Sequence, residues 1–221
     1  MKKAIVTGSE TFGKYITNPT KWLALSADGK EIAEYEIHSL VFPSVVLIPQ
    51  GAENPGETVV RKAGEIHADA IISFGMASDV KGFRIERSGT NWISNEKYLS
   101  PSENNQPLDP SQPEKEQLQT NLSFWNIEKM QELFANAHIP FDAEISDDPG
   151  QYSCNSWIYR TLLALKKKQV TIPYLFVHAA CTEEAIELIP EFDRANKQLN
   201  KKEDLLKALE IILLSLNTKM S

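Results

Sequence analysis

Short apolar segments of two kinds alternate along the chain, and this alternation constrains the fold more than any other feature. Segments rich in β-branched and aromatic residues, typical of buried strands, cover residues 3–7, 35–42, 70–75, 142–146 and 174–178. Segments with apolar residues at helical spacing cover residues 18–25, 55–66, 123–134, 152–165 and 205–216. Strands that alternate with helices predict an α/β protein with three layers, α/β/α, around an open, mostly parallel twisted sheet.

Two of the predicted helices begin with a recognisable capping signal. Asn18 stands before Pro19, which is the order of an N-cap followed by proline at the first helical position. Ser123 is expected to cap the helix that contains Ile127 and Met130.

The length of 221 residues suits one full core, so we expect a single domain over residues 1–221. Residues 94–119 carry four prolines among Asn, Ser, Glu and Gln, with few apolar residues to anchor a helix or strand. We interpret this segment as a polar loop excursion within the domain, because so long an excursion in a compact fold is usually functional or mobile.

The charge and the cysteine content exclude several classes of protein. A formal net charge of −7 disfavours a nucleic-acid partner or an anionic membrane surface, since both need a basic face. No apolar run approaches the roughly 20 residues of a membrane span, and residues 4–7 are too short for a signal-peptide core, so we expect a cytoplasmic protein. Cys154 and Cys181 lack the spacing of a zinc site, and in a reducing compartment we expect no disulfide.

Three residues are candidates for a catalytic group. Cys154 lies where a loop enters a helix, so unpaired backbone N–H groups and the positive helix end would stabilise a thiolate. His178 ends an apolar strand and could act as general base and acid, while Glu86 could orient the imidazole. Each also has a structural alternative: Cys154 as a small core residue, His178 bonded to a turn, and Glu86 paired with Arg84 or Arg87.

Four motifs, in one order along the chain, resemble segments of the pyroglutamyl peptidase I family. The segment from Val6 to Gly13, followed by Asn18-Pro19-Thr20, is similar to the TGF-x-PFG and NPS or NPT signature. The other three are similar to the family's ER-x-x-x-N, G-x-x-x-CN-x-x-x-Y and F-x-H segments, and they include Glu86 with Asn91, Cys154 with Tyr159, and Phe176 with His178. Together the matches run from about residue 4 to 181.

This resemblance implies a cysteine exopeptidase, an omega peptidase that hydrolyses the amide bond after an N-terminal pyroglutamyl residue through a thioester acyl-enzyme. Cys154 would be the nucleophile, His178 would accept and return the proton, and Glu86 would orient His178. The implied substrates are peptides with an N-terminal pyroglutamate. No metal or organic cofactor is implied, and the expected assembly is a homo-oligomer, a tetramer or a dimer.

The departures from the family pattern concern the substrate pocket. Ser9 replaces a phenylalanine that packs on the lactam ring, Met76 replaces a glutamine and Val80 replaces an arginine. Loss of an aromatic wall would weaken lactam binding by about 0.5–1.5 kcal/mol. The substrate-binding residues that we expect are Phe12, Asn18, Met76 and Tyr152.

Two other functions stay open at this point. The pocket changes would allow a thiol amidohydrolase with a shifted substrate. A catalytically silent binding protein on the same scaffold is the second alternative, since a fold does not fix a function.

Overall fold

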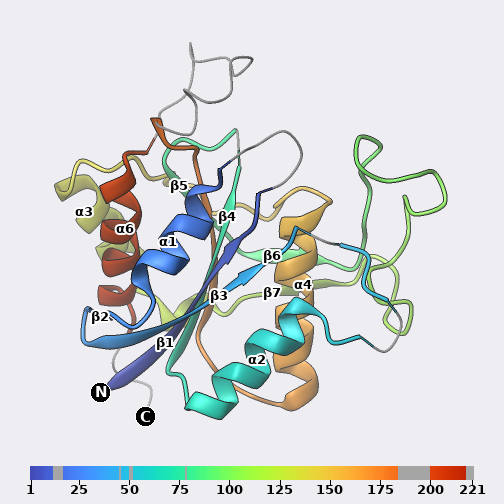
Figure 1. The fold of residues 1–221 in the computed structure, drawn as a ribbon, viewed down its shortest axis with the longest axis horizontal. Helices are drawn as coiled ribbons and strands as arrows, with labels where there is room; N and C mark the ends of the chain where they lie inside the picture. The colour runs from blue at the N-terminus through green and yellow to red at the C-terminus, as the bar shows by residue number, and fades with distance from the viewer. Residues whose placement is uncertain (12–16, 45, 50–51, 78, 184–199, 218–221) are drawn as a thin grey trace.

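The computed structural model describes residues 1–11, 17–44, 46–49, 52–77, 79–183 and 200–217. Its centre is a six-stranded sheet with the strand order β2-β3-β1-β4-β8-β5 (Figure 1). The four inner strands are parallel, and the outer strands β2 and β5 run antiparallel to their neighbours. The bounds are β1 Lys2–Ser9, β2 Glu31–Ile32, β3 Tyr35–Phe42, β4 Ala70–Met76, β5 Phe83–Glu86 and β8 Tyr174–Ala179.

Helices cover both faces of this sheet, with α1, α3 and α6 on one side and α2 and α4 on the other (Figure 1). Within β1, Ala4 and Val6 pack against the first group, whereas Ile5 packs against the second. The prediction of a three-layer α/β/α fold with an open, mostly parallel sheet is thus confirmed. The helices are α1 Pro19–Ala27, α2 Pro55–Ile66, α3 Ile127–Asn136, α4 Ser153–Lys168 and α6 Lys202–Leu214.

The start of α3 corrects the capping prediction. Ser123 lies in a short 3-10 turn, Leu122–Phe124, whereas the residue that caps α3 is Asn126. The side-chain oxygen of Asn126 accepts from the backbone N–H of Lys129 at 3.0 Å. Asparagine at this position satisfies an N–H group that the helix itself leaves without an acceptor, and it stands directly before the first apolar helical residue.

The predicted strand at residues 142–146 is wrong. Phe141, just before this segment, and Ser146, at its end, pair with Phe83 and Glu86 of β5 as isolated bridges, and the chain bends between them. Asp142 and Glu144 are residues that sheets disfavour, and the stretch between the bridges does not form a continuous ladder.

Four short strands were not predicted from the sequence, among them the two-residue edge strand β2. β5 was not predicted, although Phe83 and Ile85 alternate with Arg84 and Glu86 in the period of a strand. The strands β6 Ser88–Thr90 and β7 Gln117–Gln119 form a separate two-stranded sheet, so the last three residues of the 94–119 segment are extended and paired. This small sheet packs on α4.

Candidate active site

The centre of the sheet brings together residues from three neighbouring strands. β8 lies between β4 and β5, so His178 has Gly75 as its partner on one side and Arg84 on the other. Glu86 ends β5 and is two residues from Arg84, which places both side chains on one face of the strand. The first turn of α4 carries Cys154 to the same place.

Gly75 permits the close approach of the thiol to the sheet. A Cβ atom at this position would lie 3.0 Å from Sγ of Cys154 and 2.7 Å from a ring carbon of Phe176. The Phe176 ring meets the His178 ring edge to face, with the centroids 5.2 Å apart. A larger residue in place of Gly75 would therefore displace the thiol, the phenylalanine, or both.

Cys154 is the second residue of α4 and carries a free, half-buried thiol. The helix begins after Tyr152 without a capping side chain, and its first backbone bond runs from the N–H of Ser156 to the Tyr152 carbonyl at 3.0 Å. The N–H groups that precede Ser156 in this turn have no acceptor within the helix. Together with the helix dipole, they favour negative charge beside Cys154.

A buried hydrogen bond joins His178 to Glu86. Nδ1 of the imidazole lies 2.6 Å from Oε1 of the carboxylate, and both side chains are almost wholly enclosed. Nδ1 is thereby occupied, and Cys154 lies close enough to the ring to raise the pKa of His178. The three residues that the sequence singled out thus lie together at one place in the fold.

Arg84 is a fourth member of this group, and the sequence analysis did not assign it to the site. Its Nε donates to Oε1 of Glu86 at 2.7 Å, and its Nη1 lies 3.2 Å from Oδ2 of Asp79. Glu86 therefore accepts from His178 and Arg84 through the same oxygen. The alternation of β5 was the signal that could have placed Arg84 beside Glu86.

The charges of the group stabilise each other. Burial lowers the pKa of His178, but the adjoining Cys154 and Glu86 outweigh this effect and raise it to about 9. Burial raises the pKa of Glu86, but hydrogen bonds from His178 and Arg84 hold it below its usual value of 4.5. An imidazolium beside a carboxylate is the result, and this cation would in turn stabilise a thiolate at Cys154.

A cleft of about 410 Å³ opens onto this group. Tyr152 stacks on Tyr98, with ring centroids 5.4 Å apart, and so links the 94–119 segment to the start of α4. The lining is mixed in charge and polarity: Met76, Ala77, Asp79, Arg84, Asn95, Lys97, Tyr98, Asp148, Pro149, Gly150, Tyr152, Ser153, Cys154 and His178. Of the residues expected to bind substrate, Met76 and Tyr152 are in this cleft.

Asn18 has a different position. Its amide oxygen accepts from the backbone N–H and the hydroxyl of Thr20, at 3.0 and 2.9 Å, as the N-cap of α1. Its amide nitrogen donates to the Glu10 carbonyl and to Ser9, and Asn18 does not line the cleft. Phe12 lies outside the described residues.

The described part of the chain holds neither a cluster of metal-binding side chains nor a membrane-spanning helix. No cluster of three or more His, Cys, Asp or Glu side chains there could hold a metal ion. None of its helices combines the length and apolar character needed to cross a membrane.

A cysteine beside a histidine that is hydrogen-bonded to a carboxylate, on an α/β/α fold, is the arrangement of a cysteine hydrolase. The particular class follows from the comparison with known families: the family model described as pyroglutamyl peptidase matches residues 2–210. The chain belongs to the pyroglutamyl peptidase family, and the resemblance found in the sequence is confirmed.

Relatives match over most of their length. The pyrrolidone-carboxylate peptidase of Brachyspira hyodysenteriae is 28% identical over 217 residues, 96% of each chain, and that of Thermococcus litoralis is 26% identical over 84% of this chain and 80% of its own. Among solved structures, a mutant pyrrolidone carboxyl peptidase from Pyrococcus furiosus superimposes with a TM-score of 0.77 at 24% identity, covering 97% of both chains. The structural match supports the same fold.

Proposed function

We propose that the protein is a cysteine exopeptidase that removes pyroglutamate from the N-terminus of peptides, with Cys154 as nucleophile, His178 as acid and base, and Glu86 as the orienting group. The observation that carries the proposal is the buried hydrogen bond between His178 and Glu86, with His178 and the Cys154 thiol both lining the cleft. Membership of the pyroglutamyl peptidase family supports the choice of substrate.

The reaction follows from the charges of the group. The thiolate of Cys154 attacks the carbonyl carbon of the pyroglutamyl residue, and a tetrahedral oxyanion forms. The imidazolium of His178 then donates its proton to the leaving amine as the C–N bond breaks and a thioester remains. A water molecule gives a proton to His178 and attacks the thioester carbonyl. The C–S bond then breaks, which releases pyroglutamate and restores the pair of thiolate and imidazolium.

The first turn of α4 supplies donors for the oxyanion. Its N–H groups before Ser156 have no acceptor in the helix and lie beside the nucleophile. Donors that are fixed before the reaction stabilise developing charge without reorganisation, so they act in the transition state more than in the ground state.

Met76 and Tyr152 are the proposed contacts of the lactam ring within the cleft. Asn18 would first have to exchange its capping bonds, so its role in substrate binding is the weaker part of this proposal. The charged lining residues Arg84 and Lys97 favour a second candidate, in which the same thiol chemistry acts on an amide other than the pyroglutamyl one.

We also propose that the protein forms a homo-oligomer, either a tetramer or a dimer, and that it is located in the cytoplasm. Family membership supports the assembly, and the free thiol of Cys154 suits a reducing compartment. Light scattering on the purified protein tests the assembly directly, and a monomeric mass would contradict it.

The activity is tested with the pyroglutamyl amide of a fluorogenic amine and a panel of prolyl, glutamyl and alanyl amides, under reducing conditions. We expect preference for the pyroglutamyl amide, and Cys154→Ala should lower the rate by more than about 10³-fold. Cys181→Ala is the matched control and should keep most of the activity. Hydrolysis of other amides alone would support the second candidate, and activity that survives Cys154→Ala would refute the thiol mechanism.

A further inference from the structure

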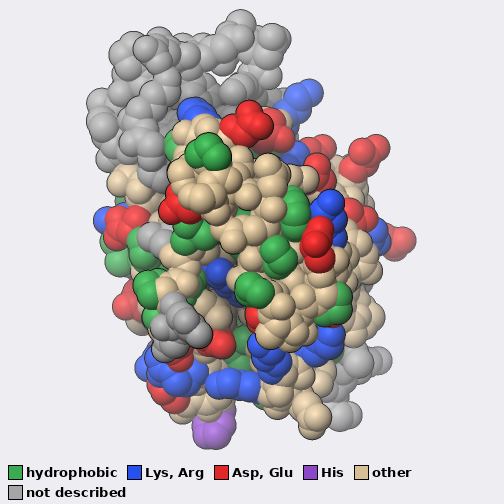
Figure 2. Space-filling view, turned by 90° about the vertical axis from the view of Figure 1, so that its right-hand side faces the viewer, with side chains coloured by type: hydrophobic (Ala, Val, Ile, Leu, Met, Phe, Trp, Pro, Cys, Tyr) green, Lys and Arg blue, Asp and Glu red, His purple; other side chains and the backbone are tan. Residues whose placement is uncertain are grey.

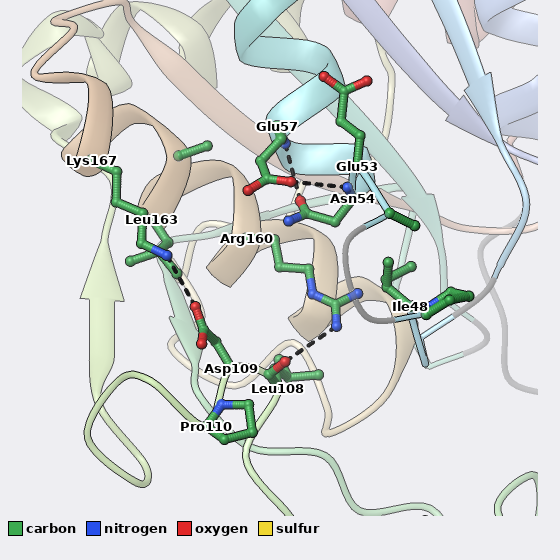
Figure 3. A pocket seen from close by; sticks show the side chains of 13 residues that line it. Ile48, Glu53, Asn54, Glu57, Leu108, Asp109, Pro110, Arg160, Leu163 and Lys167 are labelled. Carbon is green, nitrogen blue, oxygen red and sulfur yellow. Dashed lines mark hydrogen bonds and ion pairs between the residues drawn. The ribbon is translucent and has the colours of Figure 1, made fainter.

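A second cavity, of about 540 Å³, lies between the start of α2, the middle of α4 and the Leu108–Pro110 part of the 94–119 segment (Figure 3). None of the residues described around the catalytic cleft lines it. Its walls are partly apolar and partly charged: Ile48, Pro49, Ala52, Glu53, Asn54, Glu57, Leu108, Asp109, Pro110, Arg160, Leu163, Ala164 and Lys167. Its size is that of a small-molecule site.

Arg160 extends from α4 into this cavity, as Figure 3 shows. The residue is only 8% exposed, and its one side-chain hydrogen bond among the described residues runs from Nη2 to the Leu108 carbonyl at 3.3 Å. Its Nη1 is buried and has no hydrogen-bond partner in the described structure. Burial lowers the pKa of Arg160 to about 10, against the attraction of Asp109 and Glu57.

The acidic side chains around the cavity are engaged elsewhere. Each makes its close contacts with another group, and none is bonded to Arg160: Glu53 with Arg61 at 2.8 Å, Glu57 with the Asn54 N–H at 3.1 Å, and Asp109 with Lys167 at 3.1 Å. A buried guanidinium normally has an anionic partner, because removal of the charge from water is costly. Among the described residues, no carboxylate is hydrogen-bonded to Arg160 in the place of that partner.

The backbone of Arg160 is held firmly. A Cβ atom on Gly56 would lie 2.4 Å from its carbonyl carbon, so α2 and α4 are in direct backbone contact at this point. The long side chain, in contrast, is anchored at its end by the single 3.3 Å bond to Leu108. Rotation of the guanidinium can therefore turn Nη1 toward the cavity without a shift of the helix.

We propose that this cavity binds a small monocarboxylate with an apolar body, whose carboxylate is bonded by Arg160. The guanidinium fork matches a carboxylate in geometry and charge. Ile48, Leu108 and Leu163 offer an apolar wall for the rest of the ligand. A dianion such as phosphate is disfavoured, because Glu53, Glu57 and Asp109 surround the same space.

The surface around the cavity adds little selectivity of its own. Figure 2 views the molecule from the right-hand side of Figure 1. In the described part of this face, acidic and basic side chains are interspersed, without a large patch of one sign. Discrimination between a carboxylate and its neutral analogue must therefore come from Arg160 itself.

The test is a titration of the full-length protein with sodium hexanoate and with hexanamide, followed by ligand NMR line broadening. We expect hexanoate to bind with a millimolar dissociation constant or better, and hexanamide to bind at least about tenfold more weakly. Arg160→Met should weaken hexanoate binding by at least about tenfold, since a charge-assisted hydrogen bond is lost. Lys168→Met removes a positive charge from the exposed end of the same helix and should change binding by less than roughly twofold.

Equal binding of the acid and the amide would overturn the proposal, as would hexanoate binding that Arg160→Met leaves unchanged or no binding at all. Arg160→Gln serves if the methionine variant does not fold. The comparison of acid and amide needs no variant, and neither readout depends on peptidase activity.

Discussion

A half-buried arginine, Arg84, and a buried one, Arg160, border two cavities of this protein, and their surroundings are opposite. Arg84, beside the catalytic cleft, is bonded to Glu86 and Asp79, and these carboxylates raise its pKa although burial lowers it. Arg160, in the second cavity, has one backbone carbonyl, and burial lowers its pKa to about 10. Arg84 is thus part of a network of charged side chains, whereas Arg160 has no carboxylate bonded to it among the described residues.

The difference teaches what each cavity can do. In the cleft, charges are fixed by mutual hydrogen bonds before any substrate enters, which is what catalysis of charge development requires. In the second cavity no described carboxylate is hydrogen-bonded to the guanidinium, so an incoming carboxylate can take that place. The first arrangement suits the proposed chemistry, and the second suits the proposed binding.

Among the variants that test this comparison, Glu86→Gln has the largest expected effect. The change leaves Arg84 with only an exposed partner and His178 without its carboxylate, so we expect the peptidase rate to fall by about 10²–10⁴-fold, the range for a positioned acid or base. Steady-state kinetics on the pyroglutamyl amide measure it. Glu65→Gln, which alters an exposed carboxylate paired with Arg61, is the matched control. A fall of the same size in both variants would break the comparison.

The pairing of His178 with Glu86 should also make the free energy of unfolding depend on pH. The folded-state pKa of His178 is raised from 6.5 to about 9, so its stabilising contribution is complete below pH 6.5 and is lost as the pH rises through 9. The loss is on the order of 3 kcal/mol. Arg160 keeps its proton through most of this range, because its pKa is about 10.

Urea unfolding between pH 6 and pH 10 measures this loss, and His178→Gln should remove most of it. The lowered pKa of Glu86 acts at acidic pH. The contribution of Glu86 to the stability is present above pH 4.5 and is lost as the pH falls through the folded-state pKa. A flat profile in wild-type protein from pH 6 to pH 10 would contradict the assigned coupling.

Replacement of Arg84 and of Arg160 by methionine compares what each arginine contributes to the free energy of unfolding. Arg84→Met leaves Glu86 with His178 as its main partner, and we expect a loss of about 1–3 kcal/mol in the free energy of unfolding. Arg160→Met removes a buried charge that lacks an anion, so the stability should stay within about 1 kcal/mol of wild type or rise. Equal losses in the two variants would show that Arg160 has a partner of comparable strength.

Asp79→Asn is expected to have the smallest effect. Asp79 is 71% exposed and meets Arg84 at 3.2 Å, so solvent screens most of the interaction. The free energy of unfolding should fall by no more than about 0.5 kcal/mol, as for exposed pairs. A larger fall in urea unfolding would mean that the outer carboxylate, and not Glu86 alone, holds Arg84.

The inner strands and the place of the site could be predicted because their signals are local. Residues 70–75 and 174–178 are continuous apolar runs, as buried parallel strands require, and Cys154 follows a loop that enters a helix. Strand β5 was missed because it is short and half charged, and its charged face turns toward the catalytic group rather than toward water. Local pattern alone does not reveal that orientation.

The partners of the site lie beyond the reach of sequence patterns for a different reason. The stack of Tyr98 on Tyr152 joins residues 54 positions apart, and the isolation of Arg160 depends on where three separate carboxylates find their own partners. Both are properties of the packed chain. Periodicity predicts which face of an element is buried, but it does not predict which polar groups meet there.

The position of β8 between β4 and β5 has a consequence for the newly made protein. Glu86 and His178 stand 92 residues apart, and the strand that carries His178 must enter a gap between two strands that leave the ribosome long before it. Until then Glu86 and His178 are unconnected, and the proposed acid–base pair is not assembled. If these residues act as proposed, the nascent chain is silent as a peptidase until the strand that carries His178 has been translated and the sheet can close.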